Sequence, residues 1–145
     1  MPDIYHDFPI AADPAKIFRA ISTPEGLDAW WTRRSSGEPA PEALYELWFA
    51  PEYDWRGRVV AFEENAVLVW EISEADEDWT GTHVGFELTP KEGYTQVRFH
   101  HTGWPELNDH FRRSSYCWAM YLRVLKAYVE DGKKVSYEHR QDPSI

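Results

Sequence analysis

The spacing of apolar residues changes once along this chain, from the two-residue period of strands to the period of a helix. Segments of alternating apolar and polar residues continue to about residue 101. After Gly103-Trp104-Pro105, apolar residues recur at steps of three and four, with neither proline nor glycine from Glu106 to Asp131. Alternation is typical of strands with one buried face, and the longer steps are typical of one buried helical face. The pattern therefore predicts a sheet followed by one long helix.

Six strands are expected, and the links between them make neighbouring strands antiparallel. The links at Glu64-Asn65 and at residues 90–93 are short enough for hairpin turns. A parallel return would need a long crossover connection instead. The expected strands are Ile4 to Ile10, Leu44 to Phe49, Gly57 to Glu63, Val67 to Ser73, Thr82 to Thr89 and Tyr94 to His101.

Two short helices are expected after the first strand. Asp13-Pro14 and Thr23-Pro24 each combine an N-cap residue with a proline suited to the first helical position. Trp30 and Trp31 are neighbours on the second helix, so we expect one to plug the end of a cavity and the other to pack on a loop. Residues 35–43 contain two prolines and are expected to form a loop.

The expected order is therefore β-α-α-β-β-β-β-β-α, which predicts an α+β fold. A sheet with one face to bury needs a second layer, and only the C-terminal helix is long enough to supply it. A strongly twisted sheet need not close fully against one helix, which leaves room for a pocket between them. We expect a single domain over residues 1–132 and a polar C-terminal tail over residues 133–145.

Charge and composition exclude several classes of partner. The 145 residues include 15 Lys and Arg against 25 Asp and Glu, a net charge of −10. This balance repels phosphate backbones and anionic lipid, so we expect neither nucleic acid nor a membrane surface as a partner. Cys117 is the only cysteine, which excludes an intramolecular disulfide. Without a signal-peptide pattern or a span of membrane length, a cytoplasmic location is expected.

Several motifs in the same order together resemble a known superfamily. They are Ser22-Thr23-Pro24-Glu25-Gly26-Leu27 followed by Trp30-Trp31-Thr32, then Trp79-x-Gly81-Thr82, Thr95-x-Val97, His101-x-Gly103-Trp104, and Trp118 with Leu122, Leu125 and Lys126. The chain resembles the START-like (SRPBCC) superfamily, in the branch related to the C-terminal domain of the activator of Hsp90 ATPase.

The resemblance implies a helix-grip fold, in which the six-stranded antiparallel sheet wraps around the C-terminal helix and encloses a cavity. Members of the superfamily bind hydrophobic ligands, some are cyclases or related enzymes, and others bind protein partners. The two-domain chaperone activators carry a further N-terminal domain, for which 145 residues leave no room. We therefore expect ligand binding ahead of chaperone activation.

Strand parity separates inward-facing residues from outward-facing ones. Val97 and Phe99 place His101 inward and His100 outward. His101 is the one inward-facing group able to act near neutral pH, either toward a ligand or as a core histidine satisfied by a neighbour. The expected ligand-binding residues are Tyr45, Trp70, Phe86, Phe99, His101, Trp104, Trp118, Tyr121 and Leu122.

No metal or cofactor is expected. The six histidines lie on different elements or point to opposite faces, and their spacing is not that of a zinc site. The acidic residues occur mostly in runs typical of a solvated surface, and no glycine-rich phosphate loop is present. Eight tryptophans either fill a core or form the wall of a pocket. For Trp48, Trp55 and Trp79, the sequence leaves open whether the side chain is partly exposed or buried.

Three hypotheses follow. The first is a domain without catalysis or cofactor that binds a small hydrophobic or aromatic molecule between sheet and helix. The second is a cyclase- or hydrolase-type enzyme on the same fold, with His101 as the acid/base. The third is a protein-interaction module resembling a chaperone (Hsp90) activator, with a protein partner or a second copy of itself.

Overall fold

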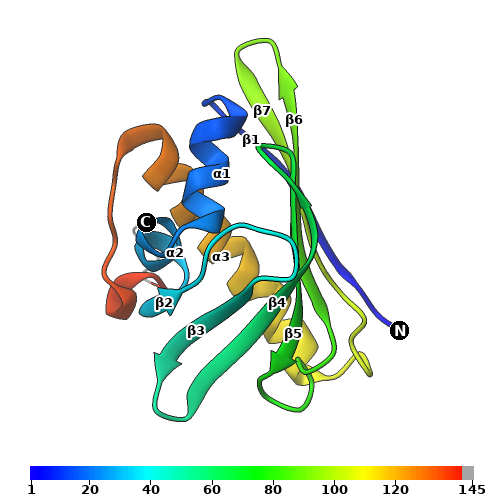
Figure 1. Ribbon diagram of the computed structural model, residues 1–145. Coiled ribbons are helices and arrows are strands. Elements are labelled where there is room, and N and C mark those ends of the chain that lie inside the picture. The colour runs from blue at the N-terminus through cyan, green and yellow to red at the C-terminus, as the bar shows by residue number, and fades with distance from the viewer. Residues whose placement is uncertain (142–145) are drawn as a thin grey trace.

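The computed structural model describes residues 1–141, and Figure 1 shows how its helices gather on one side of a single sheet. The strands are β1 (Ile4–Ile10), β2 (Arg34–Ser36), β3 (Leu44–Ala50), β4 (Tyr53–Glu63), β5 (Val67–Glu74), β6 (His83–Lys91) and β7 (Tyr94–Thr102). The helices are α1 (Pro14–Ser22), α2 (Pro24–Trp30), α3 (Asp109–Asp131) and the 3-10 turn η1 (Tyr137–His139).

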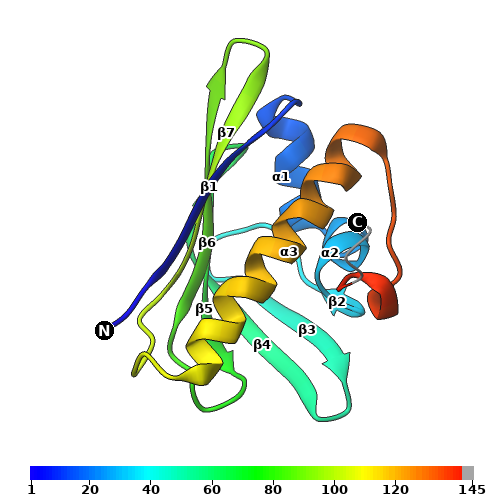
Figure 2. The ribbon, with the colours of Figure 1, turned by 180° about the vertical axis from the view of Figure 1, so that it is seen from behind.

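The sheet is antiparallel throughout and has the order β1-β7-β6-β5-β4-β3-β2. The long helix α3 crosses one face diagonally, and the opposite face carries no helix in either view (Figures 1 and 2). The predicted α+β helix-grip fold, with a sheet wrapped around a long C-terminal helix, is confirmed.

The sheet has seven strands rather than the expected six. The additional strand, β2, pairs with β3 through Ser35 and Leu47 at the start of the segment predicted to be a loop. An edge strand of three residues needs only main-chain hydrogen bonds to its neighbour. Its sequence therefore need not show the alternation of apolar and polar residues that predicts a strand. The hairpin of β3 and β4 is also longer than expected, because β4 begins at Tyr53 rather than Gly57.

The helix boundaries follow the predicted caps. The Asp13 side chain accepts a hydrogen bond from the Lys16 amide at 2.9 Å, and the Thr23 hydroxyl accepts one from the Gly26 amide at 3.1 Å. At the other end of the chain, α3 stops at Gly132, whose φ of 67° lies in the left-handed region that glycine adopts without strain.

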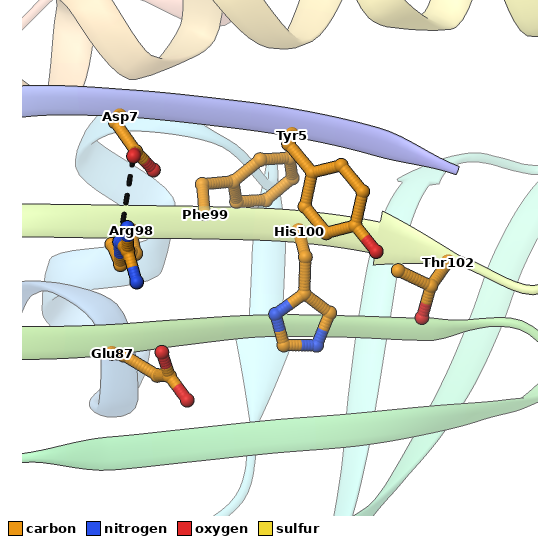
Figure 3. A pocket seen from close by; sticks show the side chains of 7 residues that line it. All are labelled: Tyr5, Asp7, Glu87, Arg98, Phe99, His100 and Thr102. Atoms are coloured by element: carbon orange, nitrogen blue, oxygen red, sulfur yellow. Dashed lines mark ion pairs between the residues drawn. The ribbon is translucent and has the colours of Figure 1, made fainter.

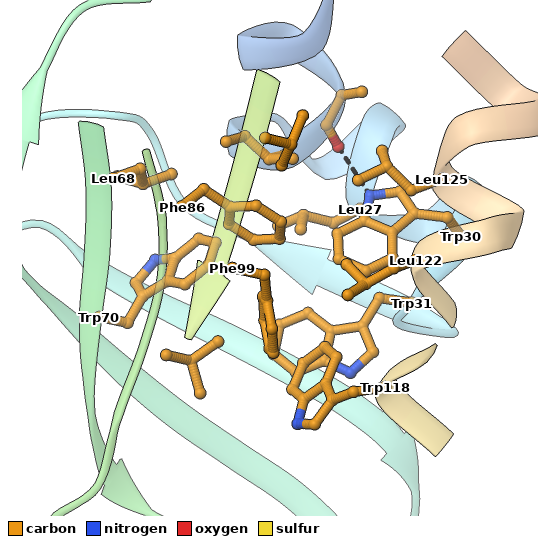
Figure 4. Close-up of a cluster of buried hydrophobic side chains, with 14 of the residues drawn as sticks. Leu27, Trp30, Trp31, Leu68, Trp70, Phe86, Phe99, Trp118, Leu122 and Leu125 are labelled. Atoms are coloured by element: carbon orange, nitrogen blue, oxygen red, sulfur yellow. Dashed lines mark hydrogen bonds between the residues drawn. The ribbon is translucent and has the colours of Figure 1, made fainter. Parts of the chain in front are cut away.

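Both tryptophans of the α2 signature lie in the core, which corrects the expectation that one of them packs on a loop. Trp31 is the C-cap of α2, and its φ of −123° and ψ of −69° leave the helical geometry. Its ring therefore turns to the same side as Trp30, at 5.9 Å between ring centroids. The Trp30 indole N–H donates to the Ala20 carbonyl at 2.9 Å, and Figure 4 shows both rings within the buried cluster.

Part of the segment expected as a polar tail packs on the domain. Val135 and Arg140 are buried, with exposed fractions of 8% and 4%. The Arg140 guanidinium donates to the carbonyls of Thr32 at 3.1 Å and of Asp28 at 2.5 Å, which ties η1 to α2. The last four residues of that segment, 142–145, lie outside the described residues.

Candidate functional site

A pocket of about 430 Å³ opens at one end of the helix layer. Five parts of the chain form its walls: the end of α2, the β3–β4 hairpin, the loop after β5, the first half of α3, and the segment that includes η1. The lining residues are Trp31, Phe49, Tyr53, Trp55, Asp76, Trp79, His110, Arg113, Ser114, Cys117, Trp118, Tyr121, Tyr137 and Gln141.

Tryptophans in mutual contact make the inner wall. Trp79 stacks on Trp118 with ring centroids 5.8 Å apart and planes inclined by 22°. Trp55 lies against Trp79 at 4.6 Å, and Trp31 lies against Trp118 at 5.1 Å. Aromatic pairs at these separations attract one another beyond the burial of their surface, and this attraction stabilises the wall. Trp79, left undecided by the sequence, is buried at 7% exposed.

The nine predicted ligand-binding residues divide between the pocket wall and the core behind it. Trp118 and Tyr121 line the pocket. The other seven are at most 3% exposed in the same hydrophobic core, namely Tyr45, Trp70, Phe86, Phe99, His101, Trp104 and Leu122. Figure 4 shows Trp70, Phe86 and Phe99 in the same buried cluster as Trp31 and Trp118. The predicted strand residues therefore point inward but contact other side chains rather than the pocket.

His101 is fully buried and both of its ring nitrogens have partners. The Trp118 indole N–H donates to Nδ1 at 3.0 Å, which makes Nδ1 the unprotonated nitrogen. Nε2 then carries the hydrogen and donates to the Thr82 hydroxyl at 2.8 Å. That hydroxyl in turn donates to the Trp79 carbonyl at 2.5 Å. The chain of bonds fixes one neutral tautomer.

Burial lowers the pKa of His101 to about 3. Removing a cation from water costs more than removing a neutral ring, and the next causes are the neighbouring rings of His100 and His110. A histidine that is neutral at pH 7, with both nitrogens occupied, has no free site for a proton from a ligand. The geometry therefore favours the core-histidine interpretation over the acid/base one.

Most of the pocket lining was not predicted from the sequence, although the residue spacing along α3 carries a usable signal. His110, Ser114, Cys117, Trp118 and Tyr121 follow one another at steps of four, three, one and three, and all face the pocket. That spacing marks one helical face. The contributions from Trp55, Trp79 and Tyr137 depend on how distant segments meet, and no local pattern shows them.

A second hollow lies on the outer face of the sheet, which the helices leave uncovered. It has a volume of about 550 Å³ and is lined by Tyr5, Asp7, Glu87, Arg98, Phe99, His100 and Thr102. Figure 3 shows the Asp7–Arg98 ion pair, whose nitrogen and oxygen are 3.4 Å apart. Its rim is charged and exposed, and it lacks the aromatic wall of the smaller pocket. We therefore take the aromatic pocket as the candidate site.

Candidate metal-ligand clusters and membrane-spanning helices were sought in the part of the chain that the structure describes. Residues 1–141 contain no group of three or more His, Cys, Asp or Glu side chains placed to hold a metal ion. No helix among these residues is both long enough and apolar enough to cross a membrane.

A seven-stranded antiparallel sheet that grips a long C-terminal helix, with an aromatic pocket at one end, defines a START-like helix-grip domain. Residues 11–130 match the family described as activator of Hsp90 ATPase homolog 1-like protein, and the chain belongs to that family. The search of curated proteins found no match.

Solved structures support the fold assignment over most of the chain. The Aha1 dimer from Colwellia psychrerythraea is 33% identical, with a TM-score of 0.83 over 92% of this chain and 99% of that one. A protein from Mesorhizobium loti is 21% identical, with a TM-score of 0.77 over 92% and 100%. CalU16 from Micromonospora echinospora is 15% identical, with a TM-score of 0.73 over 90% and 77%. The last two show likeness of fold alone.

Proposed function

We propose that this protein binds a small aromatic or hydrophobic molecule in the pocket between the β3–β4 hairpin and α3. The observation that carries the proposal is a pocket of about 430 Å³ whose inner wall is built from tryptophans in mutual contact. Ligand pockets typically have volumes of a few hundred Å³ and combine apolar walls with a few polar groups. The size and the lining of this pocket both agree with that description.

An unpartnered donor on the pocket wall supports the same proposal. The indole nitrogens of Trp70, Trp79 and Trp104 are buried without a hydrogen-bond partner among residues 1–141, and of these three only Trp79 lines the pocket. A buried N–H without a partner is costly, and native structures usually satisfy it with protein, water or a ligand. A ligand oxygen or a bound water that reaches Trp79 would remove that cost.

The proposal is tested by quenching of tryptophan emission with 4-nitroanisole, a neutral aromatic probe. We expect saturable quenching in the wild-type protein. Trp55→Ala removes a pocket ring and should weaken binding roughly tenfold, which corresponds to about 1.4 kcal/mol. Trp48→Ala is the matched control, because Trp48 lies on the same hairpin against Arg34 and outside the pocket. Absence of saturable quenching across a panel of neutral aromatic probes would overturn the proposal.

A second candidate function is a protein-interaction module, with a protein partner or a second copy of the chain. The relative from Colwellia psychrerythraea was solved as a dimer, and the family takes its name from a chaperone activator. This candidate predicts self-association in sedimentation equilibrium that is independent of pocket substitutions. A protein that is monomeric at all accessible concentrations would exclude self-association. The partner of the interaction module would then have to be a different protein.

A further inference from the structure

The histidine that lines the pocket is His110, whereas His101 is buried in the core. His110 is the second residue of α3 and lines the pocket. Its Nδ1 lies 3.0 Å from the Asp78 carboxylate, which also accepts a hydrogen bond from the Asn108 amide at 3.3 Å. The exposed side-chain fractions of His110 and Asp78 are 28% and 26%. The pair is therefore partly shielded but still open to a ligand.

The carboxylate determines which nitrogen of His110 remains available. A carboxylate only accepts hydrogen bonds, so Nδ1 carries the hydrogen and donates it to Asp78. In the neutral ring Nε2 is then a free acceptor. Hydrogen bonds from His110 and Asn108 hold the pKa of the Asp78 carboxyl below its usual range, so Asp78 is ionised at neutral pH. An ionised partner stabilises the imidazolium that forms when Nε2 takes a proton.

Arg113 brings a permanent positive charge to the same edge. It lies three residues after His110 on α3, and both side chains line the pocket. Residues three apart on a helix are neighbours on one face. The pocket thus combines a deep wall of aromatic rings with an edge that holds one cation and one proton acceptor.

We propose that this edge recognises the acidic hydroxyl group of an aromatic ligand, such as a phenol, and that His110 takes its proton. The inference rests on the proposed function and names the ligand class of the same pocket. The O–H bond of the ligand breaks, the electron pair stays on the oxygen, and the proton moves to Nε2 of His110. The resulting phenolate lies beside the imidazolium of His110, which stays paired with Asp78, and beside Arg113.

Other charged or titratable groups surround His110 on each element packed against it. Asp76 comes from the loop after β5, Cys117 from α3 and Tyr53 from the hairpin. His101 lies beyond Trp104, against which the His110 ring packs edge to face at 5.4 Å. His101 is neutral, and burial raises the pKa of the Cys117 thiol, so neither carries charge at pH 7. Asp76 on the pocket wall and the ionised Asp78 are both anions that oppose a phenolate at this edge.

A purely apolar pocket and the proposed edge shift the ionisation of a bound phenol in opposite directions. Burial in apolar surroundings disfavours the charged form and raises the pKa of a phenol. A nearby imidazolium and guanidinium favour the charged form and lower it. The sign of the shift therefore separates recognition by His110 and Arg113 from simple burial against tryptophan rings.

The experiment uses 4-nitrophenol, whose phenolate absorbs visible light and whose pKa in water lies near neutrality. Titration of the wild-type complex with pH should place the pKa of the bound probe about one unit below that of the free probe. The phenolate then binds roughly tenfold more tightly than the phenol. His110→Gln should remove most of the downward shift and leave only the part that Arg113 contributes, and Asp78→Asn should reduce it. The matched control is His83→Gln on the outer face of the sheet, which should keep the full shift.

Binding of 4-nitroanisole, which lacks the hydroxyl group, is measured in parallel on every variant. Quenching by 4-nitroanisole in His110→Gln shows that its pocket is still formed. A bound 4-nitrophenol with an unchanged or raised pKa in the wild type overturns this inference and leaves the proposed function standing. A full downward shift that persists in His110→Gln also overturns it. A protein that binds neither probe overturns the proposed function itself, and this inference with it.

Discussion

At the scale of single residues, two histidines nine positions apart have opposite environments. His101 lies in the core with both nitrogens bonded, to Trp118 and to Thr82. His110 lies at the pocket edge with one nitrogen bonded to Asp78. The same side chain is thus a structural link in one place and a proton acceptor in the other. The two histidines differ in their burial and in the number of hydrogen-bond partners around each ring. Residue type alone therefore does not determine the role of either one.

The environment of His101 predicts a specific acid sensitivity. Its pKa falls from an ordinary 6.5 to about 3 in the folded protein, chiefly through burial. Between these values the unfolded chain binds a proton that the folded protein does not. The free energy of unfolding should therefore fall as pH falls through this window, by about 1.4 kcal/mol per pH unit from this one group. Below a pH of about 3 both states are protonated, and this loss stops growing.

Urea unfolding of the wild type and of His101→Gln over this pH range measures the effect. Gln keeps an acceptor and a donor but cannot titrate, so the variant should lose stability at pH 7 and show a shallower decline toward acid. The carboxylates are identical in both proteins, so the difference in slope isolates His101. The exposed His139→Gln should follow the wild-type curve. Parallel curves for the wild type and His101→Gln would show that His101 does not control acid sensitivity.

At the scale of elements, the segment after α3 completes the pocket. Tyr137 of η1 lines the pocket and lies between two guanidinium groups, 4.6 Å from Arg33 and 5.5 Å from Arg140. Arg33 also pairs with Glu138 at 2.8 Å. The anchor is Arg140, because it is buried and donates to main-chain carbonyls at the end of α2 and to one within its own segment.

Arg140→Met tests this anchor by removing the guanidinium while keeping an apolar stem. Three carbonyls lose their donor, and we expect a loss of roughly 2–3 kcal/mol in the free energy of unfolding. Binding of 4-nitroanisole should also weaken, because Tyr137 no longer has a fixed position. Lys134→Met, an exposed change in the same segment, should alter stability by less than about 0.5 kcal/mol. Wild-type unfolding and binding in Arg140→Met would contradict the anchoring role.

The elements differ in how far the sequence predicts them. Local chemistry marks the helix starts at Asp13-Pro14 and Thr23-Pro24 and the long apolar face of α3, so these were predicted correctly. The strand β2 was not, because a short edge strand needs no apolar pattern. In the candidate site, Trp118 and Tyr121 were predicted from the spacing of apolar residues along the C-terminal helix. Trp55 and Tyr137 meet the pocket only through tertiary placement, which local spacing does not encode.

At the scale of the whole molecule, the two faces of the sheet have different characters. The helices cover one face, and the other face carries no helix (Figure 2). The aromatic pocket lies at the end of the covered face, and the hollow on the uncovered face is lined mainly by polar side chains. The net charge of −10 repels anions at long range. A ligand that enters as a neutral phenol and becomes a phenolate beside His110 avoids that repulsion on approach.

The most direct test of the central claim, that the aromatic pocket binds a ligand, is to fill the pocket. Cys117 lines it from α3, so Cys117→Phe places a ring in the space that a ligand would occupy. In the 4-nitroanisole titration, we predict one saturable site in the wild type and in Trp48→Ala. We predict that this site is lost in Cys117→Phe while the protein remains folded by circular dichroism. Equal binding by wild type and folded Cys117→Phe, or no saturable binding in either, would contradict the account.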